Sequence, residues 1–110
     1  MNIRISVAQD FSVAPGPRHI NQGKFSGEEF REKILIPKYI EAKESGCKLI
    51  IDLDGVFGYF DSFIEEAFGG LARAFPKDNI LKVIEFISTE DPFLIEKIEK
   101  YIKNATSVTA

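Results

Sequence analysis

Three segments of the chain have the hydrophobic patterns of β-strands. Residues 2–7 alternate apolar and polar side chains, and this period of two predicts a strand with one buried face. Residues 49–53 form a short, nearly continuous apolar run, which is typical of a central strand covered on both faces. Residues 80–87 are rich in Ile, Val and Phe and predict a further strand.

A first helix is expected to begin at Ser26 and to end at Gly46. Ser26 and Glu29 have the spacing of a capping box, in which each side chain bonds a free backbone N–H group. Apolar residues then recur at helical spacing, and a glycine is a natural helix end. Pro37 lacks an N–H group, so we expect a kink or a break near Ile36.

A second helix is expected from Asp61 onward. Ser62 and Glu65 have the spacing of another capping box. The pair Gly69-Gly70 lies inside this helix and should cost about 2 kcal/mol relative to two alanines. Such a pair indicates that the helix packs very close to a neighbour, or ends there.

A third helix is expected near the C-terminus, with Asp91 as its N-cap and Pro92 at its first position.

Residues 8–27, by contrast, lack periodicity and are rich in proline and glycine. Within that segment only His19-Ile20 could form a short extra strand. Residues 106–110 are expected to be a loose C-terminal tail.

The alternation of strands and helices predicts one α/β domain over residues 1–105. We expect about four strands in a mixed, partly parallel sheet, together with three helices.

Composition narrows the functional classes. The 110 residues are 45% hydrophobic and 28% charged, with a net charge of −3, as in a globular domain. An acidic chain without a Lys/Arg-rich run is a poor candidate for nucleic-acid binding. Cys47 is the only cysteine and His19 the only histidine, so the chain cannot form an internal disulfide or a typical Cys/His zinc site. No apolar run resembles a signal peptide or a membrane helix, so we expect a cytoplasmic protein without a cofactor.

Asp52 and Asp54 follow the expected central strand and are the first candidates for chemistry. Two carboxylates there could hold Mg²⁺, or act as nucleophile and acid/base in phosphoryl transfer. The string from Leu49 to Phe57 resembles the first motif of the haloacid-dehalogenase phosphatases, Asp-x-Asp-Gly-Thr/Val. That resemblance implies a minimal Mg²⁺-dependent phosphatase or phosphotransferase.

The context of the motif favours a structural role instead. The motif normally opens its domain, whereas here a strand and a helix precede it and only 55 residues follow Gly55. The remaining phosphatase motifs could be drawn only from closely spaced residues: Ser88 or Thr89, Lys82 and Glu90-Asp91. Asp52 and Asp54 would then accept hydrogen bonds from backbone N–H groups in a glycine-containing turn.

A second resemblance covers nearly the whole chain. Ile50-Ile51-Asp52-Leu53, a loop and then Asp61-Ser62 resemble the layout of a STAS domain, the fold of bacterial anti-sigma-factor antagonists. More specifically, the chain resembles a small prokaryotic family described as STAS-like and of unknown function. The residues that carry this resemblance are Asp10-Phe11-Ser12, Pro15-Gly16, Arg18, Ser26-Gly27-Glu28, Phe30-Arg31, Asp52-Leu53-Asp54-Gly55, Gly58-Tyr59 and the run from Ser62 to Leu71.

The resemblance implies a non-enzymatic regulatory module that works by partner switching. STAS proteins of this kind bind an ATPase of the histidine-kinase type, which phosphorylates a serine at the helix start and so ends the interaction. The switch serine usually lies two residues after the aspartate, a position that Phe63 occupies here. Ser62 is the neighbouring hydroxyl, and it is either a phosphorylation site or simply an N-cap.

The expected docking region is the 55–60 loop with the start of the second helix. Aromatic residues in that loop would be core residues if buried and docking anchors if exposed. The candidate partner-binding residues are Phe57, Tyr59, Phe60, Asp61, Ser62 and Glu65.

A third hypothesis is a sensor for a small anion or a nucleotide. Arg18 follows a Pro-Gly-Pro turn and could bind an anion beside the helix start at Ser26, where free N–H groups favour negative charge.

Overall fold

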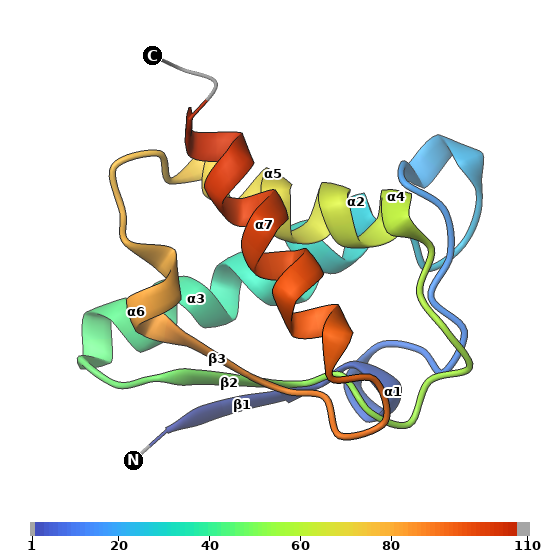
Figure 1. Cartoon of the computed structure of the whole chain (residues 1–110), viewed down its shortest axis with the longest axis horizontal. Coiled ribbons are helices and arrows are strands. Elements are labelled where there is room, and N and C mark those ends of the chain that lie inside the picture. Colours follow the sequence, from blue (N-terminus) through green and yellow to red (C-terminus); the bar gives the residue numbers. More distant parts are fainter. Residues whose placement is uncertain (1, 108–110) are drawn as a thin grey trace.

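The computed structural model describes residues 2–107, which form a three-stranded parallel sheet with helices packed on one side (Figure 1). The strands are β1 (Ile3–Ser6), β2 (Leu49–Asp52) and β3 (Ile84–Ile87), and they lie in that order. The α/β class is therefore confirmed, but within the described residues the sheet has three strands rather than four and is parallel rather than mixed. The helical segments are α1 (Val7–Asp10), η1 (Ile20–Gln22), α2 (Gly27–Phe30), η2 (Arg31–Leu35), α3 (Ile36–Ser45), α4 (Asp61–Ile64), η3 (Glu65–Gly69), α5 (Gly70–Ala74), α6 (Ile80–Val83) and α7 (Phe93–Ser107).

The segments α2, η2 and α3 follow one another without a break and form the first expected helix. Its η2 portion is a π-helix, in which the Ile36 N–H donates to the carbonyl oxygen of Arg31, five residues back. This wider turn lies immediately before Pro37, which has no N–H to donate. The expected interruption near Ile36 is therefore a π turn and not a break. Gly46 ends the helix in the left-handed conformation, with φ of 67°.

Two apolar segments adopt a different structure from the predicted one. His19-Ile20 contributes no strand, because residues 20–22 form the short 3₁₀ helix η1. The first half of the predicted strand 80–87 is the helical turn α6, and only residues 84–87 pair with β2. A short apolar run satisfies either structure, so periodicity alone does not distinguish them.

The closing helix α7 starts close to the expected position. The Leu94 and Ile95 N–H groups donate to the carbonyl oxygens of Asp91 and Pro92, so its first turn begins at the predicted Asp-Pro pair. At the other end α7 continues to Ser107, so residues 106 and 107 are helical and not part of a loose tail. Residues 108–110 of the predicted tail lie outside the described residues. No helix within residues 2–107 has the length and apolar character needed to cross a bilayer.

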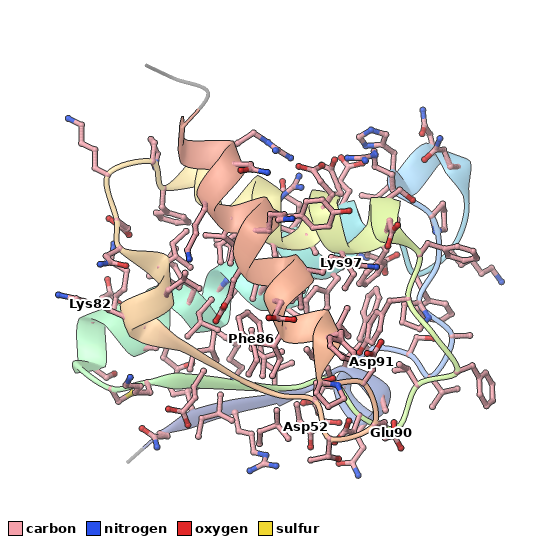
Figure 2. All side chains as sticks on the ribbon, in the orientation of Figure 1. Asp52, Lys82, Phe86, Glu90, Asp91 and Lys97 are labelled. Atoms are coloured by element: carbon pink, nitrogen blue, oxygen red, sulfur yellow. The ribbon has the colours of Figure 1, made fainter. Side chains whose placement is uncertain are left out.

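The core lies between the sheet and the helices. Leu49 and Ile51 are fully buried on the helix side of β2. Phe86 of β3 points to the same side and packs against Phe68 of η3, with ring centroids 5.5 Å apart (Figure 2). Ile50, by contrast, is only half-buried on the opposite side and does not belong to the core. The prediction that β2 is covered on both faces is therefore wrong, because α3, the helical stretch from α4 to α5 and α7 all lie on one side of the sheet (Figure 1).

Candidate functional site

Three loops meet at the carboxyl end of the sheet. Residues 53–60 connect β2 to α4, residues 88–92 connect β3 to α7, and the long loop 11–26 runs beside the first of them (Figure 1). A backbone hydrogen bond of 2.8 Å from the Phe57 N–H to the Val13 carbonyl oxygen joins two of these loops. Ligands and partners commonly bind at this end of a parallel sheet.

Asp54 fastens the 53–60 loop to the 88–92 loop. Its Oδ2 accepts hydrogen bonds from the Thr89 hydroxyl at 2.6 Å and the Thr89 N–H at 3.1 Å, and its Oδ1 accepts from the Glu90 N–H at 3.0 Å. The Thr89 hydroxyl, followed by the Glu90 N–H, lowers the pKa of Asp54 because these donors favour the ionised carboxylate. A further hydrogen bond joins the same two loops, because the Glu90 carboxylate accepts from the Gly55 N–H at 2.8 Å.

Asp52 also has a structural role. Its Oδ1 accepts the Asp54 N–H at 3.0 Å, which is the local turn expected of an aspartate before a glycine loop. Its Oδ2 lies 3.3 Å from the Arg4 guanidinium. Asp52 and Asp54 thus both accept backbone N–H groups, as the structural interpretation expects, but the donors to Asp54 lie in the 88–92 loop and not in the glycine-containing turn.

The phosphatase alternative gains no support from this geometry. The carboxylates of Asp52 and Asp54 accept hydrogen bonds from Arg4 and from the 53–60 and 88–92 loops. Figure 2 shows Asp52, Glu90 and Asp91 together at the carboxyl end of the sheet, whereas Lys82 lies at the opposite end. Lys82 precedes β3 and therefore cannot complete a site that forms after β3.

The 55–60 loop exposes two aromatic rings and anchors a third. Phe57 and Phe60 have exposed fractions of 87% and 64%. Tyr59 is half-buried, its ring packs against Phe63, and its hydroxyl donates to the Leu53 carbonyl oxygen at 2.8 Å. Burial, followed by the nearby carboxylates, raises the pKa of Tyr59 above its ordinary value. Tyr59 therefore holds the loop, whereas the Phe57 and Phe60 rings are exposed to solvent.

A groove of about 350 Å³ lies beside the two exposed rings. It is formed by Ala14 and Pro15 from the long loop and by residues 57–60. A second, more polar depression of about 250 Å³ is also lined by the 55–60 loop and contains Asp54, Glu90, Asp91 and Lys97. The loop therefore borders both an apolar groove and a charged depression.

The start of α4 differs from the predicted capping box. The helix begins at Asp61, with Phe60 as an N-cap that provides no side-chain bond. The Glu65 N–H donates to the backbone oxygens of Asp61 and Ser62, so the Ser62 hydroxyl does not cap the helix. Within residues 2–107 this half-buried hydroxyl makes no hydrogen bond. Asp61 is exposed and accepts a hydrogen bond of 2.7 Å from Lys97 of α7, which raises the pKa of Lys97.

A network of charged side chains behind α4 was not anticipated from the sequence. Arg31 donates to the Glu66 carboxylate at 2.6 Å and to its backbone oxygen at 2.8 Å, and the side chains of this pair are only 14% and 12% exposed. Arg18 donates to both Glu65 and Glu66, and Arg73 bonds Glu65 at 2.7 Å. Burial by itself raises the pKa of Glu66, but the bonds from Arg31 and Arg18 outweigh it and lower that pKa. Arg73, together with Arg18, lowers the pKa of Glu65.

Residues 26–93 match the family model described as a STAS-like domain of unknown function. The chain belongs to that family. The match runs from the N-cap of α2 to the first residue of α7, and so includes the 55–60 loop, α4 and all of the charged network except Arg18. No curated protein and no solved structure gives a significant match.

The structure of this STAS-like domain removes the basis of the predicted anion site. The first N–H groups of α2 are already bonded: Gly27 donates to the Pro17 carbonyl oxygen at 2.9 Å and Glu28 to the Arg18 carbonyl oxygen at 3.0 Å. Ser26 is confirmed as the N-cap, since its hydroxyl accepts the Glu29 N–H at 3.0 Å. The reciprocal half of that capping box is absent, because the Glu29 carboxylate turns to Lys33 at 3.4 Å. The Arg18 guanidinium is held by carboxylates, so neither half of the expected site is open to an anion.

Proposed function

We propose that this STAS-like domain is a non-enzymatic protein-interaction module. Its docking surface consists of Phe57 and Phe60, the adjoining groove at Ala14 and Pro15, and the first turn of α4. The exposure of two phenylalanine rings beside an apolar groove is the observation that carries the proposal. Exposed aromatic residues next to a pocket are typical anchors of protein interfaces. Tyr59 and Glu65 position this surface rather than contact the partner.

The anchors lie on a loop whose backbone is already fixed. The Phe57 N–H is bonded to Val13, the Gly55 N–H to Glu90, and the Tyr59 hydroxyl to Leu53. A loop held from three directions loses little conformational entropy when a partner binds. This rigidity favours a preformed docking surface.

The partner class follows from the STAS resemblance. We infer an ATPase of the histidine-kinase type, and phosphorylation at Ser62 as the event that ends binding. Ser62 lies at the edge of the docking surface, and its hydroxyl has no hydrogen bond to lose within residues 2–107. A phosphate there would add up to two negative charges beside Asp61 and Glu65 and change the surface that the partner meets.

The proposal is tested by affinity capture from the native cell lysate, with mass spectrometry of the retained proteins. We expect the wild-type chain to retain an ATPase that Phe57→Ala and Phe60→Ala each lose. Ile40→Ala is the matched control, because Ile40 is also exposed, at 37%, but lies on α3 at the other end of the molecule (Figure 1). A partner retained equally by all four proteins, or no partner at all, would refute the proposed surface.

Ser62 provides a separate test of switching. We expect Ser62→Glu to weaken binding of the captured partner by about ten-fold, because one interface charge typically changes binding by 1–2 kcal/mol. Ser62→Ala should bind like the wild type and should keep the thermal stability, because the hydroxyl caps no helix. Titration calorimetry measures the affinity of the wild type and of both variants for the partner, and circular dichroism checks that the variants are folded. Equal affinity of the glutamate and alanine variants would rule out a switch at this position.

A further inference from the structure

The side of the sheet that faces away from the helices is uncovered within residues 2–107. Two register rows of side chains lie on this side, which we call the open face: Arg4, Ile50 and Glu85, and then Ser6, Asp52 and Ile87. Their neighbours along each strand, such as Ile5, Ile51 and Ile84, are the buried ones. Successive side chains of a strand point to opposite faces, so the alternation places both rows on the open face.

An open face is unusual for a parallel sheet, because such sheets are normally covered on both sides. Ile50 and Ile87 are half-buried and lie outside the core cluster, so this face keeps an apolar centre in contact with solvent. We therefore expect a second layer of protein to cover the open face.

The charges on this face indicate what that layer is. Arg4, with a side chain 59% exposed, lies on the outer strand β1. Glu85, exposed and without an ion pair in the described part of the chain, lies on the other outer strand β3. Ile50 lies between them in the same row. The row is therefore positive at one end, apolar in the middle and negative at the other end.

We propose that the open face binds a second copy of this chain. A two-fold axis parallel to the strands places β1 of one copy over β3 of the other. Arg4 then meets Glu85 of the second copy twice, and the two Ile50 side chains meet at the axis. Such an isologous pair of sheets would pack in the aligned manner, about 10 Å apart. The two Asp52 carboxylates also approach each other, and each retains its own Arg4 partner at 3.3 Å.

The small area of the open face limits the stability of this dimer. Three short strands cover roughly 200 Å² per copy, against the roughly 800 Å² per partner of a stable interface. The dimer should therefore be weak and form only at high protein concentration. This inference does not depend on the proposed docking function.

Sedimentation equilibrium from about 10 µM to about 1 mM protein tests the proposal, since a weak dimer appears only toward the upper end of this range. We expect the wild type to shift from monomer to dimer over this range. Arg4→Glu and Glu85→Arg, each alone, should weaken self-association by about ten-fold or more, because each turns two attractive contacts into repulsive ones. An equimolar mixture of the two variants should associate like the wild type, because both contacts in the mixed dimer are again attractive.

The control is Glu44→Arg, a charge reversal on the exposed side of α3 that should leave the dimer unchanged. Ile50→Lys gives a second disruption, because it places two like charges at the two-fold axis. A wild type that stays monomeric throughout, or a mixture that associates no better than its components, overturns the proposal. Retention of the dimer in Ile50→Lys also overturns the proposal.

Discussion

At Gly27 the absence of a side chain determines how closely two helices can approach. A Cβ built at this position would lie 2.5 Å from the Phe63 backbone oxygen and 3.2 Å from the Glu66 Cβ. Gly70 has a similar role on the other helix, since Arg31 lies across it and a Cβ would be 2.4 Å from the guanidinium. The expectation that the Gly69-Gly70 pair marks close packing is thus confirmed, and the neighbour is the arginine of the buried charge network.

We predict that Gly27→Ala lowers the free energy of unfolding by about 2 kcal/mol, because a rigid backbone oxygen blocks the added methyl group. Gly58→Ala is the matched control. Nothing lies within 4 Å of a Cβ at Gly58, so its change should stay within about 0.5 kcal/mol. Urea denaturation followed by circular dichroism measures both. Equal stabilities of the two variants would show that the helices can separate at little cost.

Only part of the role of Asp52 and Asp54 could be predicted from the sequence. The Asp-x-Asp-Gly string correctly predicted a polar turn after β2. It could not show that Asp54 bonds Thr89 and Glu90, because those partners lie 35 and 36 residues away in the chain. The same string serves a catalytic or a structural site, and only the distant loop distinguishes them.

Two helical stretches and one loop are held together by charge rather than by apolar contacts alone. Arg31 of η2, Glu65 and Glu66 of η3, and Arg18 of the long loop form one connected group of ion pairs. Through Arg18 this group also fixes the loop that supplies Ala14 and Pro15 to the docking surface. The network therefore links the stability of the helices to the shape of the groove.

Acid should weaken this network. The pKa values of Glu65 and Glu66 are lower in the folded state than the ordinary glutamate value of 4.5. The folded state therefore binds protons less readily, and its advantage is complete above pH 4.5 and lost as the pH falls through the lower folded-state values. We predict that the free energy of unfolding declines below about pH 4.5, and that Glu66→Gln shows a smaller decline.

Urea midpoints at about pH 7, 5, 4 and 3 measure this dependence. Glu44→Gln is the control, because Glu44 is exposed on α3 and belongs to no ion pair in the described chain. If Glu66→Gln and Glu44→Gln decline as steeply as the wild type, the buried network does not govern acid stability.

The elements themselves were largely predictable from the hydrophobic pattern, because strand and helix periods differ. The first strand, the Ser26 cap and the Gly46 stop agree with the structure. The helical turn α6 was missed because residues 80–83 are as apolar as a strand. The uncovered sheet face was missed for a different reason. A run such as Leu49-Ile50-Ile51 reveals hydrophobicity but not the side on which the connecting helices pack.

In the whole molecule, the docking surface and the open face lie in different places. The docking surface is at the carboxyl end of the sheet, and the open face is on the side opposite the helices (Figure 1). A dimer formed through the open face therefore leaves Phe57 and Phe60 free. We therefore expect that the proposed self-association and the proposed partner binding can each be abolished without the other.

Hydrogen–deuterium exchange of the complex with the captured partner locates the docking surface on the chain. We expect slower exchange at residues 11–16 and 55–64 when the partner binds, and unchanged exchange in α3. Protection in α3 or along the sheet, with none in the 55–64 segment, would contradict the assignment of the docking surface.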